Sequence, residues 1–366
     1  MRAAFRYFAP VTISTATPVT IGAQSLEALD AFLAGNSFSR IFIIVDENTL
    51  QHCLPRLMHE TENLEGAEII ELESGEENKN IEVCTQVWRV LSELGADRRS
   101  LIVNLGGGVI TDLGGFVAAA FKRGIAFVNV PTTLLAMLDA SCGGKTGVDL
   151  DGLKNEIGFF ADPLGVFIDP HFLHTLPKRE LIAGFAEAYK HALIADAAYW
   201  QLLCSTDPAN AEYWENIIRR SVEIKQAVVA ADPFENDLRR ILNFGHTVGH
   251  AIETYYLEQS SASLLHGEAV AAGMICETLL SVKYAGLNHE TASEIINALV
   301  SRFPHIPVDD EDGERLVELM RHDKKNFDGE IMLTLVQEIG KPITGIPVNA
   351  NDLLDVLKQY RTDFVI

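Results

Sequence analysis

The sequence predicts an α/β fold, in which an N-terminal Rossmann-like domain built on a parallel sheet precedes a mainly α-helical domain. Three observations predict this fold. Short apolar strands alternate with helical patterns in the first half, and a glycine-rich turn joins one of these strands to a helix. After Leu176-Pro177 helical patterns follow one another almost without interruption. The 366 residues suffice for two domains, which we place at 1–176 and 177–366.

Five runs rich in Ile, Val, Leu and Phe are the predicted strands of the parallel sheet. They occupy residues 41–45, 67–72, 101–105, 126–130 and 165–168. Between the second and third runs, Val87, Leu91 and Leu94 recur at the spacing of an amphipathic helix that packs on a sheet. Ahead of all five, residues 11–15 and 18–22 predict an additional antiparallel hairpin at an edge of the sheet.

The second half carries helical periodicity nearly throughout. Helices are predicted at about 181–194, 211–231, 244–258, 267–284, 289–302, 313–322 and 350–362. Residues 331–336 are the one strand-like run in this half, and no internal repeat is evident. The acidic run from Asp309 to Asp312 is interpreted as a solvated loop that leads into a helix.

The charge balance excludes several kinds of partner. With 51 acidic and 29 basic residues the formal net charge is −22, which argues against nucleic acid and anionic membranes. No uncharged apolar run approaches the roughly 18 residues of a membrane span, and the first residues lack a secretory signal. The five cysteines are scattered, as expected for reduced thiols. We therefore expect a cytoplasmic enzyme with neither a nucleic-acid nor a membrane partner.

A glycine-rich turn lies between a predicted strand and a helix, at Gly106-Gly107-Gly108. Glycines let the backbone approach an anion, and the first N–H groups of a helix can bind a diphosphate. The spacing differs from the G-x-G-x-x-G fingerprint, so a simple tight turn remains an alternative. Asp46 follows the first long strand, where a carboxylate can accept hydrogen bonds from a ribose or can cap the next helix.

Two histidines four residues apart, His246 and His250, share one face of a predicted helix. Such a pair can bind a divalent metal if other segments donate further ligands, although a purely structural pair is the alternative. Glu187 and His266 are candidate ligands of this kind, drawn from separate helices. Thr247 stands where the His-Glu-x-x-His motif needs its glutamate, which excludes that class of metalloprotease.

Cations beside glycines are scarce in so acidic a chain, and any anionic substrate needs a local cluster of them. Arg123, Lys145 and Lys154 are therefore candidate oxyanion ligands. The segment Gly143-Gly-Lys-Thr146 is similar to part of a P-loop but lacks its upstream glycine spacing, so it is weak evidence for nucleotide binding.

Together these motifs resemble the 3-dehydroquinate synthase family, a member of the sugar-phosphate cyclase superfamily. The resemblance runs from about Asp46 to Gly340 and is strongest at 106–112, 130–135, 143–146, 154–155, 185–187 and 243–250. It implies an NAD-binding domain, a metal-binding domain and an active site in the cleft between them. The implied reaction converts 3-deoxy-D-arabino-heptulosonate 7-phosphate to 3-dehydroquinate and phosphate, with NAD reduced and re-oxidised in each turnover.

The resemblance also implies roles for individual residues. Glu187, His246 and His266 resemble the family's ligands for Zn²⁺ (or Co²⁺), while His250 and Glu235 resemble its acid–base residues. The matches to the ligands of the substrate phosphate are Arg123, Lys145, Asn155 and either Lys324 or Lys325. The matches to contacts with the rest of the substrate are Asp139, Lys190, Lys225, Arg239 and Asn243. The matches to the NAD positions are Asp46, Asn48, Glu76, Lys79, Gly107, Gly108, Val109, Asp112, Thr132, Thr133, Lys154, Phe172 and Thr175.

Three departures from the family pattern and three rival functions accompany this assignment. The loop between His250 and His266 is a few residues longer than usual, Ala183 replaces an asparagine of some members, and Cys142 replaces Val or Ile. The rivals are another sugar-phosphate cyclase, a metal-dependent NAD alcohol dehydrogenase and a non-catalytic nucleotide-binding protein. The family implies a sugar-phosphate substrate and a homodimer.

Overall fold

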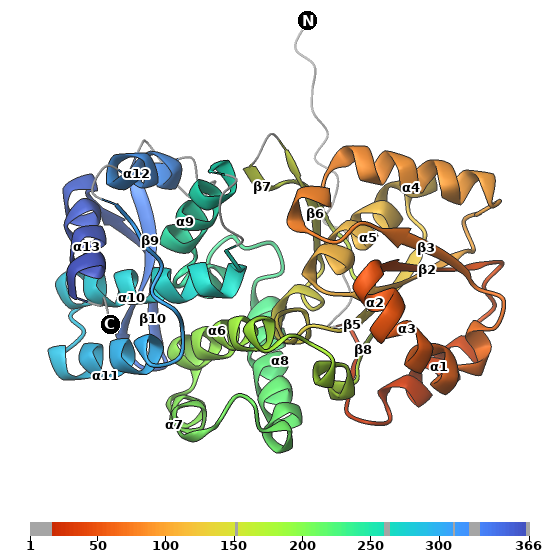
Figure 1. Ribbon diagram of the computed structural model, residues 1–366, viewed down its shortest axis with the longest axis horizontal. Coiled ribbons are helices and arrows are strands. Elements are labelled where there is room, and N and C mark those ends of the chain that lie inside the picture. Colours follow the sequence, from red (N-terminus) through yellow and green to blue (C-terminus); the bar gives the residue numbers. More distant parts are fainter. Residues whose placement is uncertain (1–16, 151–152, 260–263, 310–311, 322–329, 364–366) are drawn as a thin grey trace, which may run out of the picture.

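The computed structural model describes residues 17–150, 153–259, 264–309, 312–321 and 330–363. A sheet half and a helical half lie side by side along the longest axis, with α6 and α8 between them (Figure 1). None of the helices in the described ranges is both long and apolar enough to cross a membrane.

The N-terminal sheet has six strands in the order β1-β8-β5-β4-β2-β3, and every neighbouring pair is parallel. The strands are β1 (Val19–Ile21), β2 (Ile41–Asp46), β3 (Glu68–Leu72), β4 (Leu101–Gly106), β5 (Ala126–Pro131) and β8 (Val166–Ile168). All six residues of β4 are buried, as expected for a central strand covered on both faces. The five predicted strands and the parallel α/β class are therefore confirmed.

The second strand of the predicted edge hairpin is present as β1. It lies at the edge of the sheet and runs parallel to β8, with Val19 opposite Val166. Helix α1 (Ser25–Ala34) then carries the chain back to the start of β2, as a parallel crossover requires. The other expected strand of the hairpin, residues 11–15, lies outside the described residues.

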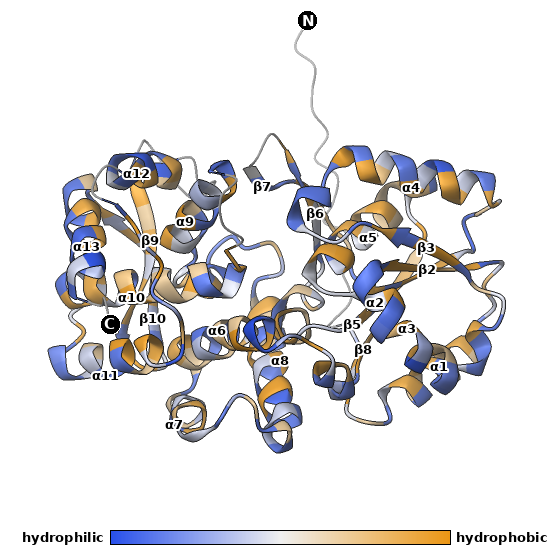
Figure 2. Ribbon diagram, viewed as in Figure 1, coloured by the Kyte–Doolittle hydropathy of each residue, from blue (hydrophilic) through white to orange (hydrophobic). Residues whose placement is uncertain are grey.

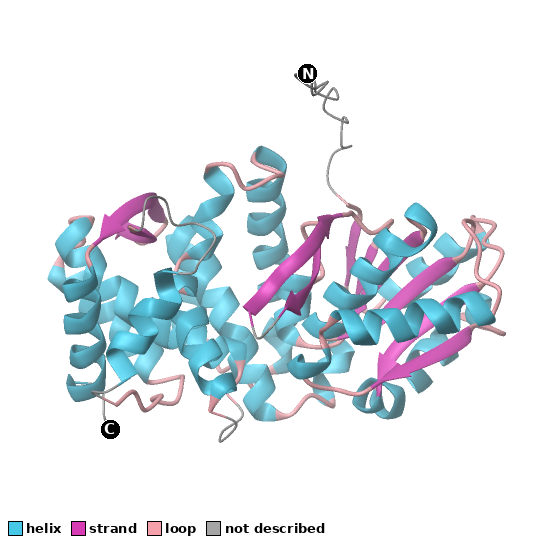
Figure 3. Cartoon of the chain, turned by 90° about the horizontal axis from the view of Figure 1, so that it is seen from above, coloured by secondary structure: helices cyan, strands magenta, loops and turns pink. Residues whose placement is uncertain are grey.

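Helices cover both faces of the sheet (Figure 3). After α1 they are α2 (Glu47–His52), α3 (Leu54–Glu60), α4 (Ile81–Glu93) and α5 (Gly108–Ala120). One face packs on α4 and α5, and the buried Val87 and Leu91 of α4 confirm the predicted amphipathic helix. The other face packs on α1 and α3.

An antiparallel hairpin that the sequence reading missed projects from this half. Its strands are β6 (Lys145–Leu150) and β7 (Leu153–Phe160), with Lys145 opposite Phe160. A short π-helical turn, η4 (Ala136–Ala140), precedes it. Glycines and charged residues interrupt the apolar alternation in this segment. Its sequence therefore drew attention to its cations and glycines and did not indicate two strands.

The second half is mainly helical, as predicted. Its helices are α6 (Lys178–Ala195), α7 (Ala197–Ser205), α8 (Trp214–Ala231), α9 (His246–Glu258), α10 (His266–Tyr284), α11 (His289–Val300), α12 (Gly313–Arg321) and α13 (Ala350–Asp363). The prediction missed α7. The acidic run leads into α12 as expected, although residues 310–311 lie outside the described ranges.

The expectation of a single strand in this half is wrong. Strand β9 (Ile331–Glu338) pairs antiparallel with β10 (Lys341–Val348). Strand β10 contains Pro342, Pro347 and Gly345, which depress strand propensity and concealed it in the sequence. Its partner β9 is largely hydrophobic in Figure 2, in keeping with the burial of Leu333 and Leu335.

The hydrophobic core is continuous between the two halves. One cluster of buried residues runs from Leu26 in α1 to Tyr360 in α13, whereas a second is confined to the α4–α5 face of the sheet. Helices α6 and α8 both pack on η4. Apolar packing thus fixes the position of α6 against the sheet half, and α6 supplies several of the candidate functional side chains.

Candidate functional site

The histidine-bearing helix α9 begins at a sharp turn. A 3-10 segment, η7 (Leu238–Asn243), ends just before Gly245, whose φ of 80° is left-handed. A Cβ at Gly245 would lie 2.4 Å from Cγ of Met274, so glycine suits this position for two reasons. The buried Glu277 of α10 accepts hydrogen bonds from the backbone N–H of Gly245 (2.6 Å) and of Val248 (3.3 Å). Helix α9 therefore begins at His246, two residues later than predicted.

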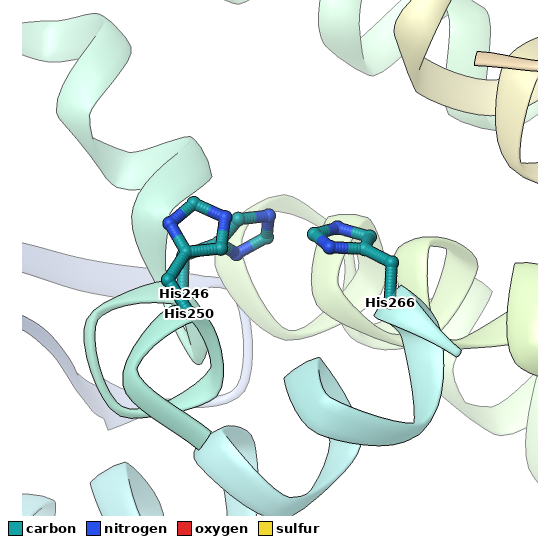
Figure 4. Close-up of side chains that lie close together, drawn as sticks. All are labelled: His246, His250 and His266. Atoms are coloured by element: carbon teal, nitrogen blue, oxygen red, sulfur yellow. The ribbon is translucent and has the colours of Figure 1, made fainter. Parts of the chain in front are cut away.

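Three imidazoles face one another (Figure 4). His246 and His250 come from the first turns of α9, and His266 is the first residue of α10. Ring centroids are 5.1 Å apart for His246 and His250, 5.5 Å for His246 and His266, and 5.6 Å for His250 and His266. One ring nitrogen of each lies within 4.8 Å of the others, which is close enough for a shared metal ion.

Glu187 of α6 completes this group. Its Oε1 atom lies 3.4 Å from Nε2 of His246 and 3.6 Å from Nε2 of His266. The Glu187 side chain is 1% exposed; its Oε2 atom contacts the ammonium of Lys190, whereas Oε1 makes no hydrogen bond within the described part of the chain. A buried carboxylate oxygen without a hydrogen-bond donor is costly unless a cation faces it. The donor set of one carboxylate and two or three imidazoles fits a divalent ion such as Zn²⁺.

Burial and charge act differently on the imidazoles. Burial lowers the pKa of His246 and Lys190 adds to the effect, so this ring favours the neutral form that binds metal. Burial also disfavours the charged form of His266, but Glu253 and Glu187 outweigh it and raise its pKa to about 9. His266 is thus held by carboxylates at both ring nitrogens.

A second acidic group lies behind Glu187, formed by Asp139, Glu187 and His191. Two ammonium groups neutralise it. Lys225 Nζ lies 2.8 Å from Asp139 Oδ1, and Lys190, itself 1% exposed, contacts Glu187 Oε2 and lies 3.7 Å from Asp139 Oδ1. Burial alone would raise the pKa of Asp139, but these two lysines hold it well below its usual range. Asp139 is therefore part of an ion-pair network with Lys190 and Lys225, whereas Oε1 of Glu187 faces the imidazoles of His246 and His266.

Polar residues from η7, from the segment before it and from the hairpin also meet. Asn243 Nδ2 donates to Glu235 Oε1 at 2.8 Å, and Glu235 also pairs with Lys145 of β6. Arg239 donates to the Gly143 carbonyl (2.9 Å), while its buried Nε atom has no hydrogen-bond partner among the described residues. The structure thus brings together the predicted residues Lys145, Glu235, Arg239 and Asn243.

The glycine turn has the geometry that the sequence predicted. Helix α5 begins directly after β4, and its N-cap Gly107 offers no side-chain cap, which leaves its first N–H groups open to a ligand. A Cβ at Gly107 would lie 3.0 Å from Cγ2 of Thr133, so the turn and Thr133 are in close contact. Lys79 lies beside this turn, 2.8 Å from Asp112 Oδ2 and 2.8 Å from Asn155 Oδ1.

The other predicted cofactor residues differ in their structural environment. Asp46 caps α2 by accepting from the Thr49 backbone N–H through Oδ1, which was the alternative reading of this residue. Thr132 and Phe172 are buried, and Thr175 Oγ1 donates to the Phe172 carbonyl at 3.0 Å. Asn48 is the second residue of α2, and Gly108 and Val109 are the first two residues of α5.

The other predicted phosphate ligands are Arg123, which lies far from the glycine turn, and either Lys324 or Lys325. Arg123 is exposed, with a left-handed φ of 69°, and ends η3 (Phe121–Arg123) at the far end of α5 from the glycine turn. At 1.5 Å per residue, the 13 residues of α5 separate the two ends by about 20 Å. Lys324 and Lys325 lie outside the described residues.

Sequence reasoning missed Glu253, Glu277 and His191. Glu253 contacts both His266 and Lys154, and Glu277 binds the start of α9. His191 is fully buried, with Nε2 3.5 Å from Asp139 Oδ1. In the sequence each is an ordinary polar residue of a helix. The one available signal was the spacing of Glu253 three residues after His250, which places both on one helical face.

Comparisons with known sequences agree with this geometry. The model of the 3-dehydroquinate synthase N-terminal domain matches residues 69–183, and that of the C-terminal domain matches residues 184–326. The chain is 42% identical to 3-dehydroquinate synthase of Parabacteroides distasonis over 92% of this chain and 96% of that protein. It is 41% identical to the synthase of a Nitratiruptor species over 80% of this chain and 83% of that protein.

Solved structures with the same fold include two cyclases. A 2-deoxy-scyllo-inosose synthase in complex with carbaglucose-6-phosphate, NAD⁺ and Co²⁺ has a TM-score of 0.81 and 27% identity, covering 93% of this chain and 96% of that one. A 2-epi-5-epi-valiolone synthase of Streptomyces hygroscopicus with NAD⁺ and Zn²⁺ has a TM-score of 0.83 and 26% identity, covering 97% and 99%. An iron-containing alcohol dehydrogenase of Thermotoga maritima, at 16% identity and a TM-score of 0.68 over 95% and 98%, shares the fold.

Proposed function

The chain belongs to the 3-dehydroquinate synthase family, and from that premise we propose a role in the reaction for each candidate residue. The enzyme is a lyase of the shikimate pathway that converts 3-deoxy-D-arabino-heptulosonate 7-phosphate to 3-dehydroquinate and phosphate. The observation that carries the proposed assignment is Oε1 of the buried Glu187, which has no hydrogen bond among the described residues and lies against imidazoles from two other helices.

We propose that Glu187, His246 and His266 hold a divalent ion, Zn²⁺ or Co²⁺, and that NAD binds along the glycine turn. The two cyclase structures hold NAD⁺ with Co²⁺ or Zn²⁺, which supports both assignments. The proposed NAD residues are Asp46, Asn48, Glu76, Lys79, Gly107, Gly108, Val109, Asp112, Thr132, Thr133, Lys154, Phe172 and Thr175. When bound, the dinucleotide supplies reversible redox chemistry and the metal ion supplies Lewis acidity.

The substrate is proposed to lie between the metal site and the hairpin. Arg239 is suited to its carboxylate because a guanidinium binds a carboxylate in two places, and the Nε atom of Arg239 is buried without a hydrogen bond. Lys145 and Asn155 are proposed for its phosphate, and Arg123 and one of Lys324 and Lys325 are proposed to join them. The proposed contacts of its hydroxyl groups are Asp139, Lys190, Lys225 and Asn243.

Proton transfer is assigned to His250 and Glu235. His250 lies beside the metal ligands, with its ring 5.1 Å from that of His246. Glu235 accepts from Asn243 and pairs with Lys145, so both neighbours hold its carboxylate in a fixed position. Glu235 has a left-handed φ of 57°, a backbone strain that is maintained at this position by the surrounding contacts.

One assay tests the function against its rivals. Purified enzyme is supplied with heptulosonate phosphate, NAD and Zn²⁺, and phosphate release, dehydroquinate and NADH are followed together. We expect phosphate and dehydroquinate in equal amounts without net NADH. Steady NADH accumulation would indicate a dehydrogenase instead. Turnover of an aldose phosphate but not of heptulosonate phosphate would indicate another sugar-phosphate cyclase.

A homodimer in a reducing, cytoplasmic compartment is also proposed. Its support is a patch of exposed apolar side chains, which consists of Phe159, Phe160, Leu164 and Phe234. A hollow of about 380 Å³ lies beside this patch. All five cysteines lie in the described ranges and are free thiols, as expected in the cytoplasm. Light scattering should give twice the 40.2 kDa mass of one chain, and a monomer at micromolar concentration would contradict the proposal.

The division into domains at 1–176 and 177–366 remains a proposal as well. It is supported by the change from strands to helices at α6, which begins at Lys178.

A further inference from the structure

Glu253 of α9 lies between the two halves of the molecule and contacts a charged group of each. Its Oε2 atom is 3.1 Å from Nδ1 of His266, and its Oε1 atom is 2.7 Å from Nζ of Lys154 on β7. The side chain is 4% exposed and that of Lys154 is 11% exposed. One buried carboxylate thus connects a proposed metal ligand to a residue of the hairpin.

The contact with His266 fixes which ring nitrogen carries a proton. A neutral imidazole that donates Nδ1–H to a carboxylate has its lone pair on Nε2. In this chain Nε2 of His266 is the atom that lies 3.6 Å from Oε1 of Glu187. Glu253 therefore directs the electron pair of His266 toward the place where Glu187 and His246 converge, as carboxylates commonly do behind metal-binding histidines.

The contact with Lys154 continues as a chain of alternating charges toward the glycine turn. Lys154 Nζ lies 3.0 Å from Oε1 of Glu76, Glu76 lies 3.5 Å from Lys79, and Lys79 lies 2.8 Å from Asp112 near the start of α5. In this largely buried row every charge faces an opposite one. Such a row holds its members in place because moving one of them leaves a buried charge unpaired.

We infer that Glu253 is a positioning residue for the reaction: it holds His266 in the tautomer that binds metal, and Lys154 fixes the Glu253 carboxylate in the orientation that does so. This inference rests on the proposed metal site. Glu253 touches neither the proposed substrate nor the metal position, so it acts through His266. The two oxygens of a carboxylate are both acceptors, and both are needed here because His266 and Lys154 are both donors.

A Glu253→Gln substitution tests the need for two acceptors. Glutamine has one acceptor and one donor, and the Lys154 ammonium attracts the amide oxygen. The amide NH₂ then faces Nδ1 of His266 and favours the proton on Nε2, which blocks metal binding. We expect the zinc affinity of the metal-free protein, measured by competition with a chromogenic chelator, to fall about 10-fold to 100-fold.

A second substitution separates this effect from general damage. In the Lys154→Met/Glu253→Gln double variant no ammonium holds the amide oxygen, so the amide can turn and offer its oxygen to His266. Zinc affinity should therefore recover at least several-fold over that of the single Glu253→Gln variant. Glu258→Gln, on the same helix but 45% exposed and paired with Arg315, is the matched control and should bind zinc like the wild type.

The outcomes distinguish this inference from the proposed metal site. If wild-type zinc affinity is unchanged by Glu253→Gln but lost in His246→Ala, the metal site stands and the positioning role is refuted. If His246→Ala also leaves zinc affinity unchanged, the metal site itself is refuted. A double variant that binds zinc no better than Glu253→Gln would refute the role of Lys154. If Glu253→Gln does not fold, Lys154→Met alone should lower zinc affinity several-fold because the Glu253 carboxylate is no longer fixed, and an unchanged affinity would refute the role of Lys154.

Discussion

At the residue scale, Glu187 uses its two oxygens in different ways. Oε1 faces the imidazoles of His246 and His266, whereas Oε2 contacts the ammonium of Lys190, one turn later on α6. Burial works against the charge of Glu187, but Lys190 and His246 hold the pKa of this carboxyl well below its usual range. The lysine thus keeps the carboxylate charged while it leaves the other oxygen for a metal ion.

The division between His246 and His250 is the first prediction at this scale. All three imidazoles could reach one ion, but Glu187 lies against His246 and His266. His246→Ala should therefore lose bound zinc, whereas His250→Ala should retain it and lose turnover by at least 100-fold, as expected for a lost acid–base group. Metal analysis and turnover of the two purified variants check this, and equal zinc loss in both would show that His250 is a ligand as well.

The functional importance of a single residue could be predicted where its residue type and spacing are uncommon. The pair of histidines and the cations beside glycines stood out, and the structure places His246 and His250 together and Lys145 beside Glu235. Glu253 did not stand out because a glutamate three residues after a histidine is common on helix surfaces. Its function depends on β7, which comes about 100 residues earlier in the chain.

At the scale of elements, the start of α9 determines where the imidazoles lie. Gly245 reverses the chain after η7, and Glu277 binds the first free N–H groups of the helix. A carboxylate at a helix N-terminus also interacts favourably with the helix dipole. The rings of His246 and His250 are therefore positioned by the backbone of α9 and by α10, before any metal binds.

Two glycines with the same backbone conformation allow a matched test of this turn. Gly245 and Gly286 have φ values of 80° and 76°, but a Cβ at Gly286 would meet nothing within 4 Å, whereas one at Gly245 would overlap Met274. Gly286→Ala should cost about 1–2 kcal/mol of unfolding free energy from backbone strain alone. Gly245→Ala should cost at least about 1 kcal/mol more, because overpacking adds to the strain.

Urea denaturation of the two variants checks this prediction. The same samples should show weakened zinc binding for Gly245→Ala and unchanged zinc binding for Gly286→Ala. Equal stability losses in both variants would mean that Met274 and α10 shift freely, and that the start of α9 does not depend on this close contact.

The β6–β7 hairpin is the element that sequence reasoning most needed and did not predict. It carries Lys145, Lys154 and Asn155, and Asn155 has a left-handed φ of 53°. The hairpin packs on α5 through β6. Its strands are defined by that packing and by their pairing with each other, whereas their sequences alternate poorly between apolar and polar residues.

At the scale of the whole molecule, a chain with a net charge of −22 buries several cations near the candidate site. Lys79, Lys190, Lys225 and Arg239 are all among the buried residues. Each faces a carboxylate or a carbonyl, so charge is balanced locally within an acidic protein. Cations held in this way offset the repulsion that an anionic sugar phosphate would meet in the overall field.

The buried carboxylates predict how stability depends on pH. Asp139, Glu187 and Glu253 all have pKa values well below the usual range, since the nearby cations outweigh the effect of burial. In the unfolded chain they bind protons near their ordinary pKa values of about 4, so the unfolded state takes up more protons there. The stability that they contribute is present above about pH 5 and is lost as the pH falls.

Thermal unfolding of the metal-free protein between pH 3 and 6 checks this expectation. The midpoint should fall steeply below about pH 5, and Asp139→Asn should flatten that slope because one of the three groups no longer titrates. An unchanged slope in the variant would show that Asp139 is not the low-pKa group in this network.

The sequence by itself determined the α/β class, five strands of the parallel sheet, most helices of the second half and the family. Those features depend on local periodicity and on short motifs, which are present in the chain before it folds. Tertiary structure alone decided that β1 runs parallel to β8, that the β6–β7 hairpin faces α9, and that Glu253 joins His266 to Lys154. These are contacts between residues far apart in the chain, and the free energy of burying their charges depends on partners that no local pattern reveals.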